Sequence, residues 1–134
     1  MNVLLTGGAG YIGSHMAVAL AQAGHQPVVL DNFCNSKPSV MARVAALSGQ
    51  AVPLVQADVR DTSAVVRAIT EHRIEAVVHF AALKAVGESV AKPLLYFENN
   101  VGGLLSLLKA MQSTGCRQIV FSSSAVVYLS LIHI

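Results

Sequence analysis

The stretch Thr6 to Gly13, TGGAGYIG, limits the possible folds more than any other part of the chain. Its glycines stand at positions 7, 8, 10 and 13, directly after an apolar run and directly before residues with helical spacing. A glycine-rich turn between a first strand and a helix is typical of sheets in which backbone N–H groups and the helix N-terminus bind a phosphate. We therefore expect Gly7, Gly10 and Gly13 to keep side chains away from a closely bound pyrophosphate.

Strand-like and helix-like segments alternate along the chain. Apolar runs rich in β-branched residues predict strands at 2–6, 27–31, 52–57, 75–81 and 118–122. Helical spacing predicts helices at 11–23, 38–47, 62–72 and 93–112. Continuous apolar strands suit a parallel sheet that helices cover on both faces. The sequence therefore predicts an α/β fold, a doubly wound, Rossmann-like parallel sheet of five strands that stops before a sixth.

Two local signals bear on the helices. Asp61 or Thr62 is expected to cap the helix predicted at 62–72. Gly102 and Gly103 interrupt the helix predicted at 93–112, where each is about 1 kcal/mol less favourable than Ala. They indicate close helix packing or a kink.

Composition and charge exclude several function classes. With 134 residues, 54% of them hydrophobic, the chain can bury a core, and its net charge of +2 contains no basic run, so no nucleic-acid partner is expected. Apolar stretches are too short to span a bilayer and no signal peptide is apparent, which predicts a cytoplasmic protein without membrane contact. Cys34 and Cys116 lie far apart and the histidines form no ligand pair, so reduced thiols and no metal site are expected.

Asp31 ends the second predicted strand, 18 residues after Gly13. A carboxylate in that position of a dinucleotide-binding unit accepts hydrogen bonds from the adenosine ribose and repels a 2′-phosphate, which favours NAD over NADP. The alternative interpretation is that Asp31 only caps a loop. The complete strand–turn–helix–strand context favours the NAD site.

Further polar residues follow the other predicted strands, where ligands bind in open α/β sheets. Asp58 follows the third strand, Phe80 to Lys84 follow the fourth and Ser122 to Ser124 follow the fifth. Each also has a structural interpretation: Asp58 and the serines could cap helices, and the FAA residues could be core. Lys84 could be a solvated surface residue or could place its charge near the phosphates.

Several longer motifs carry a resemblance to a known family. They are TGGAGYIGSH, DNFCNS at 31–36, Asp58–Val59, HFAALKAVGESV at 79–90, YFENNV at 96–101 and FSSSAVVY at 121–128. Together they resemble the UDP-glucose 4-epimerases of the extended short-chain dehydrogenase/reductase family, over residues 1–128. ALKAVGESV is the most discriminating, because sugar-nucleotide 4,6-dehydratases usually differ there.

The resemblance implies a role for each matching residue. Tyr11 and Ile12 would bind the pyrophosphate and Asp31 the adenosine ribose, with 32–36 as the loop around that end of the cofactor. Asp58 and Val59 would flank the adenine, 80–84 would run beside the pyrophosphate and the nicotinamide-side ribose, and Asn99 would support the site. Ser124 would be the active-site serine that binds the substrate hydroxyl. The implied NAD-binding residues are Gly7, Gly10, Tyr11, Ile12, Gly13, Asp31, Asn32, Phe33, Cys34, Asn35, Ser36, Asp58, Val59, Phe80, Ala81, Ala82, Leu83, Lys84 and Asn99.

The implied reaction interconverts UDP-glucose and UDP-galactose through a 4-keto intermediate, a step of galactose metabolism in a homodimeric enzyme. The family's Tyr-x-x-x-Lys pair is absent, and residues 129–134, LSLIHI, depart from the family pattern. We therefore expect an incomplete NAD-binding domain at 1–128, an unrelated tail at 129–134 and no C-terminal substrate domain. For this chain alone we expect no epimerase activity, and a homodimer is doubtful. A non-catalytic NAD-binding remnant and part of a 4,6-dehydratase are the alternatives.

Overall fold

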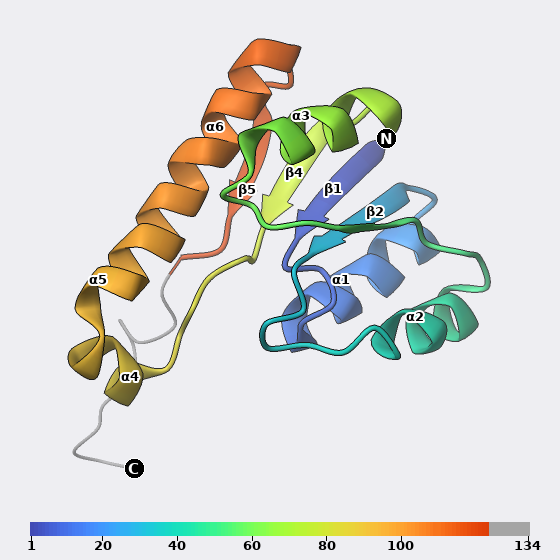
Figure 1. Cartoon of the computed structure of the whole chain (residues 1–134). Coiled ribbons are helices and arrows are strands. Elements are labelled where there is room, and N and C mark those ends of the chain that lie inside the picture. Colours follow the sequence, from blue (N-terminus) through green and yellow to red (C-terminus); the bar gives the residue numbers. More distant parts are fainter. Residues whose placement is uncertain (124–134) are drawn as a thin grey trace.

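The computed structural model describes residues 1–123 and contains one sheet with helices on both faces (Figure 1). In chain order the elements are β1 (Asn2–Thr6), α1 (Tyr11–Gln22), β2 (Gln26–Asp31), α2 (Val40–Ser48), β3 (Leu54–Gln56), α3 (Thr62–Glu71), β4 (Ala76–His79), α4 (Val86–Ala91), α5 (Pro93–Tyr96), the π-helical turn η1 (Phe97–Gly102), α6 (Gly103–Thr114) and β5 (Gln118–Phe121). Within these residues, no helix is both long and apolar enough to cross a membrane.

The sheet has the strand order β3-β2-β1-β4-β5, and every pair is parallel. Thr6 at the end of β1 lies opposite Leu30 of β2 and His79 of β4. The carboxyl ends of the three central strands therefore meet at one edge of the sheet. The chain runs outward from β1 to β3 and then crosses to β4, which makes this edge the topological switch point where open α/β sheets bind ligands. The doubly wound parallel sheet predicted from the sequence is confirmed.

Alternate residues of the central strands fill two separate cores. Leu4 and Val77 pack toward α3 and α6, whereas Leu5 and Val29 pack toward α1 and α2. Figure 1 shows the two helix pairs on opposite faces of the sheet. Successive side chains of a strand point to opposite faces, so a strand covered on both sides must be apolar throughout. This explains the continuous apolar runs in the sequence.

The helical region before β5 is more divided than the predicted single helix at 93–112. It consists of α5, η1 and α6, and α4 precedes it where no helix was predicted. Gly103 is buried, and a Cβ on it would lie 2.9 Å from Cγ1 of Val59, whereas nothing lies within 4 Å of a Cβ at Gly102. The expected close packing therefore occurs at Gly103. Asp61 caps α3 as expected, because its carboxylate accepts the N–H of Ala64.

Candidate functional site

A cavity of about 410 Å³ opens at the carboxyl ends of the central strands. Most of the residues predicted to bind a cofactor line it: Gly7, Gly10, Tyr11, Ile12, Gly13, Asp31, Asn32, Cys34, Asn35, Ser36, Asp58, Val59, Phe80, Ala81, Ala82, Leu83, Lys84 and Asn99. Phe33 does not line it, because its side chain packs against the core between the sheet and α1 and α2. Ser124 lies outside the described residues.

The glycine turn is compact mainly because of its own backbone. Gly7 has a φ of +70°, and a Cβ on it would lie 2.8 Å from the backbone nitrogen of Ala81. A Cβ on Gly13 would overlap the carbonyl oxygen of Gly7 and lie 2.6 Å from Cα of Gly8. Gly10 is less crowded, with Gly7 O at 3.2 Å as its single close neighbour, a tight contact. Chain packing by itself therefore excludes side chains at Gly7 and Gly13, and their exclusion by a bound pyrophosphate stays a prediction.

The N-terminus of α1 presents free backbone donors to the cavity. Tyr11, Ile12 and Gly13 begin the helix, and their N–H groups have no hydrogen-bond acceptor among the described residues. The first turn also contains no acidic side chain, and the cap at Gly10 provides no side-chain acceptor. Unpaired N–H groups at the positive end of a helix bind anions, and a bare Gly10 allows close approach. These residues fit a pyrophosphate.

Asp31 holds the two loops beside this turn. Its Oδ2 accepts the N–H of Ala9 at 3.0 Å, and its Oδ1 accepts the N–H of Phe33 at 2.8 Å and the hydroxyl of Ser36 at 2.9 Å. The side chain is buried yet lines the cavity. Asp31 therefore does cap the loop that follows β2. Because two carboxylate oxygens can accept about four hydrogen bonds, capacity remains for a ligand hydroxyl.

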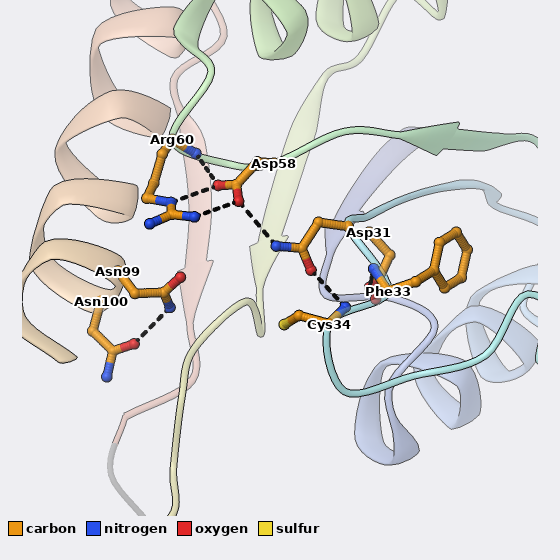
Figure 2. A network of polar contacts seen from close by, with 8 residues as sticks. Asp31, Phe33, Cys34, Asp58, Arg60, Asn99 and Asn100 are labelled. Atoms are coloured by element: carbon orange, nitrogen blue, oxygen red, sulfur yellow. Dashed lines mark hydrogen bonds and ion pairs between the residues drawn. The ribbon is translucent and has the colours of Figure 1, made fainter. Parts of the chain in front are cut away.

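Asp58, which lines the cavity, forms an ion pair with Arg60 two residues later. Both of its oxygens bond to the Arg60 guanidinium, Oδ1 to Nε at 2.9 Å and Oδ2 to Nη2 at 2.8 Å, and Asn32 donates to Oδ2 (Figure 2). The hydrogen bonds from Arg60 hold the pKa of Asp58 well below its usual range. Asp61, not Asp58, caps α3, so the capping interpretation of Asp58 is wrong.

The segment after β4 combines core packing with cavity lining. Phe80 packs toward α1 and α2 and Ala81 toward α3 and α6, while both also line the cavity. Lys84 is exposed at the cavity and forms no ion pair with any residue in 1–123. Its ammonium group adds positive charge to the same cavity that the N-terminus of α1 lines, a site that already favours anions.

Five residues that line the cavity were not predicted as site residues: Leu30, Ala57, Ala85, Glu88 and Tyr96. Tyr96 is buried, donates its hydroxyl proton to Glu88 and accepts the N–H of Ala85 at 3.1 Å. Burial raises the pKa of Tyr96, and the contact with Glu88 acts in the same direction. Asn100 bonds to both backbone groups of Leu83. No motif marks these contacts in the sequence, because they join segments that only the fold brings together.

A buried polar pair lies beneath the cavity at the ends of β1 and β4. Nδ1 of His79 is 2.6 Å from Oγ1 of Thr6, and the imidazole stacks on Phe121 with ring centroids 5.8 Å apart. Burial lowers the pKa of His79. The neutral imidazole satisfies the only buried hydroxyl of the central strand, which agrees with a structural rather than a metal-binding role.

Comparison with protein-family models finds a match to the NAD dependent epimerase/dehydratase family over residues 3–131. A UDP-glucose 4-epimerase of Klebsiella pneumoniae is 52% identical over 128 residues, covering 96% of this chain and 92% of that protein. The UDP-glucose 4-epimerase of Yersinia pestis is 54% identical over 96% of this chain. The chain spans only 38% of the Yersinia protein's length.

Solved structures give the same result. UDP-glucose 4-epimerase from Stenotrophomonas maltophila, with bound NAD and formylated UDP-arabinopyranose, is 53% identical with a TM-score of 0.93 over 99% of this chain and 40% of its own. The enzyme from Bifidobacterium longum, in complex with NAD+ and UDP, is 45% identical with a TM-score of 0.92 over 96% of this chain and 38% of its own.

Proposed function

Because the chain belongs to the NAD-dependent epimerase/dehydratase family, we propose that it forms the NAD-binding N-terminal part of a cytoplasmic UDP-glucose 4-epimerase. The whole enzyme would interconvert UDP-glucose and UDP-galactose in galactose metabolism. Residues 1–128 would be the NAD-binding portion, with the sugar-nucleotide domain outside these 134 residues. The observation that carries the proposal is the row of unpaired N–H groups at Tyr11, Ile12 and Gly13 beside the bare Gly10, in a chain half identical to NAD-binding epimerases.

Different residues of the cavity would bind different parts of NAD. The N-terminus of α1 would bind the pyrophosphate, and the spare acceptor capacity of Asp31 would bind the adenosine ribose hydroxyls. The buried Asp31 carboxylate would repel a 2′-phosphate, which is the physical basis for choosing NAD over NADP. Bound NAD would supply the hydride acceptor and donor for carbon 4 of the hexose. Lys84 would place its ammonium group near the phosphates, and Ser124 would bind the substrate hydroxyl.

The 134-residue polypeptide taken alone would bind NAD without epimerising sugars. Epimerisation needs a base with a pKa lowered toward neutrality, and the Tyr-x-x-x-Lys pair that supplies it in the resembling family does not occur in these residues. An origin in a sugar-nucleotide 4,6-dehydratase is the alternative. Interconversion of UDP-glucose and UDP-galactose by the purified polypeptide would contradict the proposed inactivity.

The cofactor proposal is tested by titrating the purified chain with NADH, followed by nicotinamide fluorescence, and by competition with NAD and NADP. We expect NAD to compete at least about tenfold better than NADP, since Asp31 would face the adenosine ribose. Asp31→Asn should narrow that ratio, whereas Asp61→Asn, which changes a carboxylate that caps α3 away from the cavity, should leave it unchanged. A folded chain that does not bind NADH refutes the proposal.

The homodimer proposed for the whole enzyme has a candidate surface on α5, η1 and α6. Leu94, Phe97, Val101, Leu105 and Leu108 recur at helical spacing and are between 41% and 81% exposed. An apolar stripe of this kind marks a protein interface. Phe97→Glu should lower the sedimentation mass of the whole enzyme, whereas Leu47→Glu, at an exposed leucine of α2, should not. Equal masses for both variants would place the interface elsewhere.

A further inference from the structure

The Asn100 side chain connects two parts of the cavity wall, Leu83 and Asn99. The N–H of Leu83 donates to Oδ1 of Asn100 at 2.8 Å, and Nδ2 of Asn100 donates to the carbonyl oxygen of Leu83 at 2.9 Å. The same Oδ1 accepts Nδ2 of Asn99 at 3.0 Å (Figure 2). Only the amide oxygen can accept and only the nitrogen can donate, so these contacts fix the orientation of the Asn100 amide.

The paired bonds to Leu83 resemble those that a neighbouring strand would make. Phe80 still donates its N–H to Thr6 of β1, but the segment 81–85 has left the sheet, and no strand within residues 1–123 pairs with Leu83. Asn100 supplies the missing donor and acceptor from the π-helical turn η1. Ala85 is held in a similar way by the Tyr96 hydroxyl. The backbone on both sides of Lys84 is therefore tied to α5 and η1.

The contact with Asn99 decides which atom that residue presents. Because Nδ2 of Asn99 donates to Asn100, its Oδ1 is the end left for other partners, and that oxygen accepts no hydrogen bond from residues 1–123. Asn99 and Lys84 both line the cavity, although they lie on different segments. At this wall of the cavity, Asn99 therefore offers a hydrogen-bond acceptor and Lys84 offers an ammonium group.

We propose that Asn100 is a positioning residue for the nicotinamide half of the cofactor site: its amide holds Leu83, and through it Lys84, together with Asn99. The proposal rests on the proposed function, because it assigns the α1 and Asp31 end of the cavity to the adenosine half of NAD. Asn100 itself does not line the cavity, so its effect acts through the groups that do. Its loss should weaken NAD binding while leaving ligands of the adenosine end unaffected.

The test compares NAD with AMP, which lacks both the nicotinamide half and the second phosphate, the groups that Lys84 would contact. Asn100→Leu keeps the branching of the side chain but removes both polar functions. We expect it to weaken NAD binding roughly tenfold or more, as happens when a partner that orients ligand-contacting groups is removed, and to change AMP binding by less than about twofold. Asn100→Asp keeps the acceptor for Leu83 and Asn99 but loses the donor to the Leu83 carbonyl. Its affinity for NAD should lie between those of the wild type and Asn100→Leu.

A second measurement does not depend on affinity. Hydrogen exchange of a peptide spanning 82–86 should become faster in Asn100→Leu, while peptides of β1 and β2 stay protected. The matched control is Asn2→Ala, which also removes an amide bonded to backbone carbonyls, those of His72 and Arg73, but away from the cavity. That variant should leave exchange at 82–86 and the NAD affinity unchanged.

The outcomes separate the two proposals. A wild-type chain that binds NAD, with an Asn100→Leu variant that binds it equally well, overturns the role of Asn100 alone. Equal losses of NAD and AMP affinity, with faster exchange throughout, also overturn it, because they indicate a general structural role. A folded wild-type chain that binds neither ligand overturns the proposed function first and the role of Asn100 with it.

Discussion

The adjacent glycines Gly102 and Gly103 allow one packing contact to be measured by itself. Both have helical backbone angles, with φ of −60° and −61°. A Cβ at Gly102 would meet nothing within 4 Å, whereas one at Gly103 would lie 2.9 Å from Cγ1 of Val59. Each glycine is replaced by Ala in turn. The two variants share the same chemical change at adjacent positions, the end of η1 and the start of α6, and differ mainly in what the new methyl group meets.

The magnitudes follow from two opposing effects. Ala is more favourable than Gly inside a helix by about 1 kcal/mol, so Gly102→Ala should raise the free energy of unfolding by about 0.5–1 kcal/mol. Gly103→Ala gains the same propensity but overpacks against Val59, which is only 5% exposed and has a stiff, branched side chain. Overpacking of this kind costs about 1–3 kcal/mol. The free energies of unfolding of the two variants should therefore differ by about 1–3 kcal/mol.

Urea denaturation measures this difference directly, and at roughly 4 °C per kcal/mol the melting temperatures should differ by about 4–12 °C. A double-mutant cycle adds Val59→Ala, which removes the methyl group that the new side chain meets. Val59→Ala should destabilise the Gly103→Ala background less than the wild type. If Gly103→Ala is as stable as Gly102→Ala, the close approach of α6 to Val59 is refuted.

Three further predictions concern charged and polar groups. Asp31→Ala leaves the N–H groups of Ala9 and Phe33 without their acceptor and should lower the free energy of unfolding in urea by about 3 kcal/mol; Asp31→Asn, which keeps one acceptor oxygen, should lose less. The folded-state pKa of Asp58 is depressed, so its stabilisation is present at neutral pH and is lost as the pH falls below about 4. Because the Asp58–Arg60 pair is partly exposed, the free energy of unfolding should fall by at most about 1 kcal/mol over this pH range. In Asp58→Asn this part of the pH dependence should be absent. The folded-state pKa of His79 is also depressed, so the melting temperature should fall as the pH drops below about 6.5, and His79→Asn should weaken this dependence; an unchanged pH profile would contradict a buried neutral imidazole.

The sequence predicts the sheet well because the strands are buried on both faces. Residues such as Leu4 and Val29 face different cores, so neither face tolerates polar groups and the apolar runs are unambiguous. The first strand is predicted with its observed bounds, and the ends of the others differ by at most two residues. Phe80 and Ala81, the last two residues of the strand predicted at 75–81, are apolar but lie beyond the final pairing of β4 with β1.

The parts that sequence reasoning missed depend on contacts between distant segments. The helix α4 has no buried residue and no apolar periodicity to reveal it. It packs beside Tyr96, whose hydroxyl bonds to Glu88. Asn100 appears in the sequence as one polar residue in FENN, and its partner Leu83 is 17 residues away. The glycine turn was located correctly, but the reason for Gly7 and Gly13 is visible only when the backbone of Ala81 and the turn itself are in place.

The contact between the glycine turn and Ala81 sets an order for folding. The turn follows β1, the first strand of the chain, yet it rests on backbone that directly follows β4. During synthesis, the glycine turn after β1 can therefore reach its final conformation only once the chain through Ala81 has emerged from the ribosome. Contacts of such long sequence separation are slow to form and leave apolar strands exposed in the meantime. Nascent chains that end before β4 are expected to depend on chaperones, whereas chains that include β4 and the residues after it can complete the turn.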